Sequence, residues 1–164
     1  MIKKYLRWLF LLFLLFLGAM AFYDYSQSEF TRKTFVFYSI EEEAWVVEER
    51  MIKLGDSQEI NITRYVEDAL LGPFTQNCLP LFPIETRLLS LLYDDNVVYI
   101  NLSEDAAMPH KEGGEVLKSL KTLYSGIKRN FSSIKDIRIF IMGRAVFPEE
   151  LAEYSKFAAQ DGLW

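Results

Sequence analysis

The chain offers one cysteine and one histidine, Cys78 and His110, as candidates for nucleophilic catalysis. A cysteine nucleophile needs a neighbouring base, and the base needs a third group to orient it. The sequence indicates no third residue, and both candidates lie in predicted loops. A single cysteine also excludes an internal disulfide. We therefore interpret Cys78 as a small buried hydrophobic residue beneath a proline-rich loop.

The remaining reactive side chains are carboxylates, and their spacing matches no known site. Cysteine and histidine are too few for a zinc site. The acidic runs at residues 94–96 and 104–105 lack the spacing of an EF-hand loop, so we interpret them as polar turns. A glycosidase needs two acids across a cleft, and no pair stands out among 23 Asp and Glu residues. We predict a protein that is not an enzyme and has no catalytic residue, metal or cofactor; a carboxylate hydrolase is a minor alternative.

Aromatic residues make up 15% of the chain. Four of them, Trp45, Phe74, Phe82 and Trp164, do not all fit the apolar faces of the predicted elements. Exposed aromatic side chains on an acidic domain favour a protein interface. Packing beneath loops is the alternative. These four residues are the candidate interaction surface.

The elements that would position this surface begin with a targeting segment at residues 1–23. Three basic residues precede an apolar run from Trp8 to Tyr23, which is the order of a secretory signal. The run is about 16 residues, or about 24 Å as a helix, short for a bilayer core of about 30 Å. Ala19-Met20-Ala21 fits a signal peptidase site. Two interpretations stay open: a retained anchor, which we favour, and a signal cleaved after Ala21.

The charge pattern predicts where the rest of the chain lies. Basic residues before the apolar run keep the N-terminus in the cytoplasm, so the remainder is exported. The chain carries −5, and its first 21 residues hold three positive charges and no negative one, which leaves −8 on the exported part. This acidity excludes nucleic acid as a partner. We predict a single-pass protein of the bacterial cytoplasmic membrane with an extracytoplasmic C-terminal domain.

The pattern of apolar residues divides the exported part into a linker (24–33), a domain (34–147) and a C-terminal extension (148–164) that is helical at about 148–159. Strands are expected at 34–38, 45–51, 86–93, 97–102 and 137–141. Helices are expected from an Asn61 N-cap to Gly72-Pro73, with Ile60 and Tyr65 as a hydrophobic staple, and over 115–131. The order β-β-α-β-β-α-β predicts an α+β two-layer sandwich. In it, two helices cover one mixed or antiparallel sheet of about five strands.

Three segments resemble the GerMN domain family of sporulation and spore germination proteins. They are ALLGP at 69–73, LFPIETRLLS at 81–90 and VVYINLS at 97–103, and the resemblance spans about residues 31–147. Glu85 and Asn101 stand where the family pattern has Gly and Asp. The resemblance implies a compact α+β envelope domain that acts as a scaffold or binding module, with no catalytic residue to carry over. The chain has no Leu-x-x-Cys lipobox near the apolar run.

Together these patterns predict a non-enzymatic, membrane-anchored domain that binds an envelope protein or associates with itself. The alternative is a module that binds peptidoglycan or another cell-wall ligand, or assists a cell-wall enzyme.

Overall fold

The computed structural model describes the backbone of residues 2–26, 30–108 and 116–146, and the side chains of residues 8–23, 30–108 and 116–146. Its elements, in chain order, are α1 (Ile2–Ser26), β1 (Phe30–Ser39), β2 (Ala44–Lys53), α2 (Gln58–Leu70), β3 (Cys78–Leu79), β4 (Leu88–Asp94), β5 (Val97–Leu102), the 3-10 helix η1 (Glu104–Ala107), α3 (Val116–Asn130), β6 (Asp136–Ile141) and β7 (Arg144–Ala145). The α+β class and the order of the five long strands and two domain helices are as predicted. The helix predicted at 148–159 lies outside the described residues.

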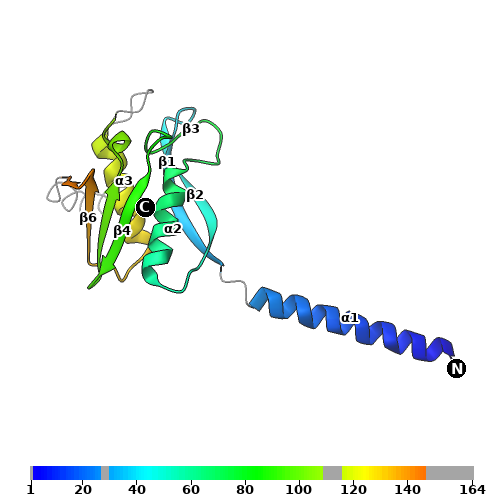
Figure 1. The fold of residues 1–164 in the computed structure, drawn as a ribbon. Helices are drawn as coiled ribbons and strands as arrows, with labels where there is room; N and C mark the ends of the chain where they lie inside the picture. The colour runs from blue at the N-terminus through cyan, green and yellow to red at the C-terminus, as the bar shows by residue number, and fades with distance from the viewer. Residues whose placement is uncertain (1, 27–29, 109–115, 147–164) are drawn as a thin grey trace.

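Helix α1 occupies the predicted targeting segment and projects away from the domain in Figure 1. In the part of the chain that the structure describes, no helix combines the length and the apolarity that a membrane span needs. The anchor and the cleaved signal therefore both stay predictions. The predicted linker at 24–33 is too long, because α1 continues to Ser26 and β1 begins at Phe30. Residues 30–33 are strand because they pair with residues 50–53 of β2.

The strands form two sheets, which corrects the prediction of a single sheet. One sheet has the order β2-β1-β3 and is antiparallel. The other has the order β4-β5-β6-β7 and is mixed, because β5 and β6 are parallel. Helix α2 contacts both β2 and β4, and Figure 1 shows it between the two sheets.

The edge of β1 explains why the sheets stay separate. The Thr34 N–H donates to Asn130 Oδ1 at 2.9 Å, and the Thr34 carbonyl accepts from Asn130 Nδ2 at 2.7 Å and from the Tyr65 hydroxyl at 3.1 Å. Side chains from both helices thus satisfy the backbone groups that another strand would need. Nothing in the spacing of the sequence indicates that side chains take the place of a neighbouring strand at Thr34.

Helix α2 is capped differently from the prediction. Ser57 is its N-cap, and its hydroxyl accepts the Ile60 N–H at 3.2 Å. Asn61 lies inside the helix, where its Oδ1 accepts the Gly55 N–H at 2.7 Å. With Ser57 as the N-cap, Ile60 lies inside the helix and not before its cap, so the predicted staple with Tyr65 is wrong. The helix ends before Gly72, whose φ of +85° suits glycine.

The rest of the fold follows its apolar pattern closely. The β4–β5 hairpin turns at Asp95 and Asn96, whose φ angles are +43° and +64°, as a two-residue turn between strands requires. Both sheets and both domain helices contribute to a single apolar core. Its largest fully buried side chains are Phe35, Phe37, Phe82, Ile62, Ile100, Leu102, Leu120, Leu123, Ile127, Ile137 and Ile139.

Candidate interaction surface

The four aromatic residues predicted as a surface take different places. Phe82 is only 2% exposed and belongs to the core, so its assignment to the surface is wrong. It is buried because the proline-spaced loop folds over the core together with Leu81. Phe74 is 72% exposed, and Trp45 is half-buried. Trp164 lies outside the described residues.

Trp45 belongs to a cross-strand aromatic pair. Its ring meets Tyr38 of β1 edge-to-face, with centroids 5.5 Å apart and planes at 74°. The Lys118 ammonium of α3 lies 5.1 Å from the Trp45 ring and 5.7 Å from the Tyr38 ring. The pair therefore joins the hairpin to α3 and leaves Trp45 only partly available to a ligand.

Beneath Phe74 lies a buried charge that the sequence analysis missed. Arg50 is 6% exposed. Its guanidinium donates to the carbonyls of Asp68 at 2.9 Å and Gly72 at 2.7 Å, and its Nε donates to Glu48 at 2.6 Å. The same guanidinium lies 3.9 Å from the Phe74 ring centroid. Arg50 therefore fixes the end of α2 and supports the exposed ring.

Glu48 holds the loop that carries Phe74. Its carboxylate accepts the backbone N–H groups of Phe74 at 3.1 Å and Thr75 at 3.2 Å, and the Thr75 hydroxyl at 3.0 Å. Burial disfavours its charge, but the hydrogen bonds from Arg50 and Thr75 outweigh burial and lower the pKa of Glu48. Desolvation instead raises the pKa of Asp68, the second acid near Arg50. Glu48 is thus the main counter-charge of Arg50.

A signal for this centre exists in the sequence, in the alternation of β2. Successive side chains of a strand point to opposite faces. Glu48 and Arg50 are two residues apart and so share one face of the strand, which in the structure is the inner face, where Arg50 and Ile52 are buried. Two neighbouring charges of opposite sign on one face indicate an ion pair, but neither its burial nor its partners on α2 could be inferred from spacing.

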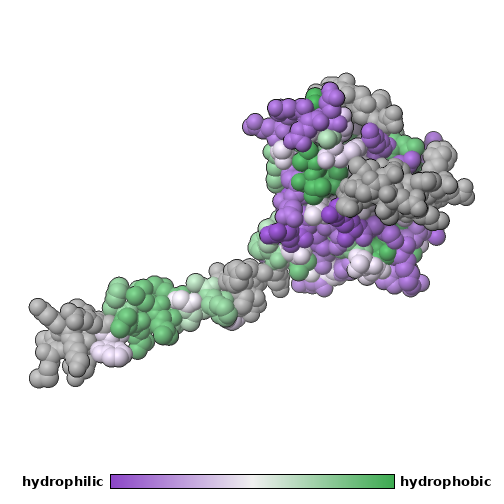
Figure 2. Space-filling view, turned by 180° about the vertical axis from the view of Figure 1, so that it is seen from behind, coloured by the Kyte–Doolittle hydropathy of each residue, from purple (hydrophilic) through white to green (hydrophobic). Residues whose placement is uncertain are grey.

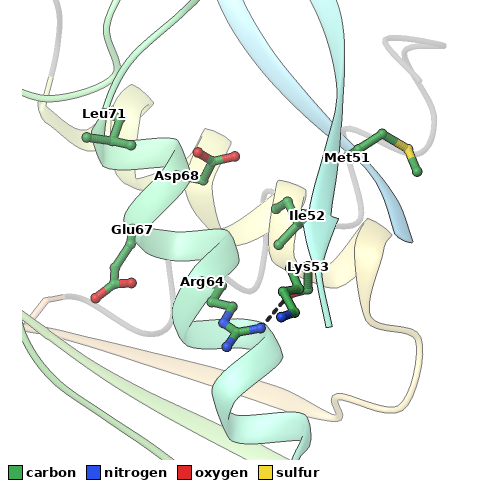
Figure 3. Close-up of a pocket in the computed structure, with 7 residues that line it drawn as sticks. All are labelled: Met51, Ile52, Lys53, Arg64, Glu67, Asp68 and Leu71. Atoms are coloured by element: carbon green, nitrogen blue, oxygen red, sulfur yellow. Dashed lines mark hydrogen bonds between the residues drawn. The ribbon is translucent and has the colours of Figure 1, made fainter. Parts of the chain in front are cut away.

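A shallow depression of about 300 Å³ runs beside this centre, between β2 and α2. Figure 3 shows Ile52 and Lys53 on the strand, with Arg64, Glu67, Asp68 and Leu71 on the helix. Arg64 donates to the Lys53 carbonyl at 2.7 Å. Met51 points away from the helix in this view and is 60% exposed. The lining contains no aromatic ring.

The residues considered for catalysis do not form a site in the described structure. Cys78 is half-buried at the start of β3, and burial raises the pKa of its thiol, so the thiolate that a nucleophile needs is disfavoured. His110 lies outside the described residues. Among the described residues, no three His, Cys, Asp or Glu side chains gather as metal ligands. The acidic run at 94–96 makes the β4–β5 turn, as predicted.

The surface differs sharply between α1 and the domain. Figure 2 shows apolar residues along α1 and a mainly hydrophilic domain with local apolar areas. On β2 and the loop after α2, the exposed apolar side chains are Val47 (48%), Met51 (60%), Leu71 (72%) and Phe74 (72%). Val47 and Met51 alternate with Glu48 and Arg50 along the strand, so they lie on the face of β2 opposite the one on which Phe74 packs against Arg50.

Comparison with known proteins gives one family and one fold. A model of the Germane family, described as sporulation and spore germination, matches residues 22–147. The tandem GerMN domains of the sporulation protein GerM from Bacillus subtilis superpose with a TM-score of 0.52 at 13% identity, covering 72% of this chain and 41% of that one. The first GerMN domain of the same protein gives 0.49 at 15% identity, covering 71% and 86%. No curated protein matches the chain.

Proposed function

Because the chain belongs to the Germane family of sporulation and spore germination domains, we propose that it is a non-enzymatic envelope domain that binds another protein or builds an assembly. The match to residues 22–147 confirms the GerMN resemblance predicted from the sequence. It gives the class of domain and the process with which the family is associated. The interaction role is our inference from the surface.

One observation carries this proposal: Phe74 is exposed yet firmly held. Its ring is 72% exposed and rests on the Arg50 guanidinium, while Glu48 accepts its backbone N–H. Aromatic side chains that are already ordered lose little entropy on binding, and such residues often dominate protein interfaces. Val47 and Met51 are also exposed, on the opposite face of the neighbouring strand.

We further propose that α1 keeps the domain at the outer face of the cytoplasmic membrane. The large apolar side chains from Trp8 to Leu17 are 46% to 74% exposed, so the domain does not cover them. Basic residues precede them in the chain, which favours a cytoplasmic N-terminus. A domain that works by binding benefits from a fixed position. N-terminal sequencing of the mature protein tests this point, since a start at Phe22 would show that the segment is cleaved.

The binding role can be tested by purification of the full chain from membranes after chemical crosslinking. We expect a crosslinked partner or a self-assembled species that survives extraction. Phe74→Ala should weaken recovery of that species by about tenfold or more, because interface anchors contribute about 2 kcal/mol or more. Met142→Ala removes a side chain that is 58% exposed on the β6–β7 turn and is the matched control.

Two results would count against this proposal. A chain that stays monomeric and retains no partner would remove the interaction role. Retention on peptidoglycan with no protein partner would favour the cell-wall alternative. The described surface offers little for a saccharide, because Trp45 is packed against Tyr38 and the depression beside β2 has no aromatic lining.

A further inference from the structure

Strand β2 is an edge strand of its sheet, and the hydrogen bonds of β1 show which β2 residues have backbone groups that point outward. Both backbone groups of Thr34 bond to side chains on the side of β1 away from β2. Thr34 is opposite Glu49. In an antiparallel ladder, such a pair is not hydrogen-bonded, and its members point in opposite directions. The N–H and C=O groups of Glu49 therefore point outward, as do those of Val47 and Met51 at alternate positions.

These outward groups have no partner within the described residues. No hydrogen bond of the described chain reaches the backbone of Val47, Glu49 or Met51. At the end of the strand, the outward carbonyl of Lys53 accepts from Arg64, which agrees with the inferred direction. The register of β2 against β1 runs without a bulge over ten residues. Such a long regular edge can accept another strand.

The other long edge strand is protected. On β4, the outward N–H of Tyr93 donates to the Glu59 carboxylate of α2 at 2.9 Å. The register of β4 also shifts between Leu88 and Ser90, which marks a bulge, and bulges interrupt edge pairing. Strands β3 and β7 have only two residues each. Among the described strands, β2 is therefore the edge that is both long and open.

We propose, on the basis of the interaction role above, that β2 pairs antiparallel with β2 of a second copy of this chain, with the two Met51 residues at the two-fold axis. In this register Glu49 of each copy is opposite Lys53 of the other. Opposite charges across a strand pair stabilise it. A register centred on Glu49 would place two carboxylates together, which is unfavourable. Of these two registers, the charges on β2 therefore favour the one centred on Met51.

The groups around this contact are compatible with it. Glu49 already pairs with Arg32 across the hairpin at 3.1 Å, and both side chains are mostly exposed, so this ion pair is weak and replaceable. Arg64 and Glu67 of α2 line the depression beside β2. The Lys53 carbonyl already accepts from Arg64, and its second lone pair would accept the Glu49 N–H of the other copy. The pairing would also cover part of the exposed Met51 side chain.

The connection to α1 fits the same axis. Phe30, the first residue of β1, is opposite Lys53, which is two residues from Met51. Each β1 strand therefore begins about 7 Å along the strand direction from the two-fold axis. Two copies held in one membrane would have their tethers close together. Tethering to one membrane raises the effective concentration of the two domains for each other, which favours pairing even when the contact area is small.

Cysteine crosslinking of the full chain in membranes tests the pairing and its register. In a Cys78→Ala background, single substitutions Val47→Cys, Glu49→Cys and Met51→Cys are oxidised, with the exposed turn position Met142→Cys as control. Paired residues at the axis have Cα atoms about 5.5 Å apart, within disulfide range. We expect Met51→Cys to form a disulfide dimer several-fold faster than the other three. The side chains of Val47, Glu49 and Met51 are all exposed, so these replacements should leave the fold intact.

A charge exchange gives the second measurement. Lys53→Glu should slow crosslinking through Met51→Cys, and Glu49→Lys combined with Lys53→Glu should restore it. Fastest crosslinking at Glu49→Cys, equal crosslinking at Met142→Cys, or no response to the charge changes would overturn the inference. If no β2 position crosslinks while Phe74→Ala still abolishes recovery of a partner, the pairing fails and the interaction role stands.

Discussion

The guanidinium of Arg50 lies 3.9 Å from the ring centroid of Phe74, so that an exposed aromatic ring rests on a buried charge. Arg50 is 6% exposed and Phe74 is 72% exposed. On its inner side the same guanidinium lies 4.7 Å from the Phe35 ring. Arg50 thus joins the core, the end of α2 and the exposed ring of Phe74, so its replacement should affect stability and binding together.

Replacement of Arg50 should be severely destabilising. Arg50→Ala leaves the Glu48 carboxylate and two buried carbonyls without their donor, and loss of one partner of a buried ion pair costs about 3–5 kcal/mol. Arg50→Lys keeps the charge but loses the planar fork, so it should recover only part of the loss. Chemical denaturation of the full chain in detergent measures both. Arg138→Ala is the control, because its ion pair with Asp136 is largely exposed; a similar loss there would contradict the special role of Arg50.

The contribution of Glu48 should depend on pH. Its pKa is lowered in the folded state from an ordinary value of 4.5. A carboxyl group with a lowered folded pKa stabilises the fold above its unfolded pKa, and this stabilisation disappears as pH falls through the folded pKa. Glu48→Gln should therefore be less stable than the parent at neutral pH, and the difference should shrink below pH 4.5. A difference that stays constant between neutral and acidic pH would contradict the assignment.

Gly126 leaves room for the hydroxyl of Tyr65. A Cβ at this position would collide with that hydroxyl, which bonds the Thr34 carbonyl at 3.1 Å. Gly to Ala inside a helix normally gains about 0.5–1 kcal/mol, so a loss of stability in Gly126→Ala would show the steric conflict. Adding Tyr65→Phe should return part of the loss. Unfolding of the two single variants and the double variant measures the coupling, and simple additivity would rule out direct contact.

Two phenylalanines on either side of β3 should differ in what their replacement does. Phe82→Ala removes a side chain that is 2% exposed and should cost about 3–5 kcal/mol. Phe74→Ala removes an exposed ring and should change stability by about 1 kcal/mol or less, since it loses mainly a cation–π contact. Thermal unfolding separates the two, and partner recovery is expected to fall only with Phe74→Ala at temperatures where both variants are folded. Equal destabilisation would contradict the positions described here.

The sequence by itself determined the elements whose apolar residues repeat clearly. Ile62, Tyr65 and Val66 have the sequence spacing of one helical face, and all three are buried in α2. Strand β5 matches its predicted range of 97–102. The turn at Asp95-Asn96 was also predicted, and the GerMN resemblance proved correct. These features could be predicted because they depend on neighbours along the chain, where helical and strand periods are expressed directly.

Only the tertiary structure decided which residues meet across the fold. The division into two sheets depends on Asn130 reaching Thr34, and the burial of Arg50 depends on carbonyls at the end of α2. Phe74 and Phe82 lie in the loops before and after β3, yet Phe82 is in the core and Phe74 is on the surface. Loop residues show no helical or strand periodicity. Hydrogen bonds from side chains to backbone groups far away in the sequence follow no fixed spacing. Contacts of this kind arise from packing in three dimensions, so they appear only once the chain is folded.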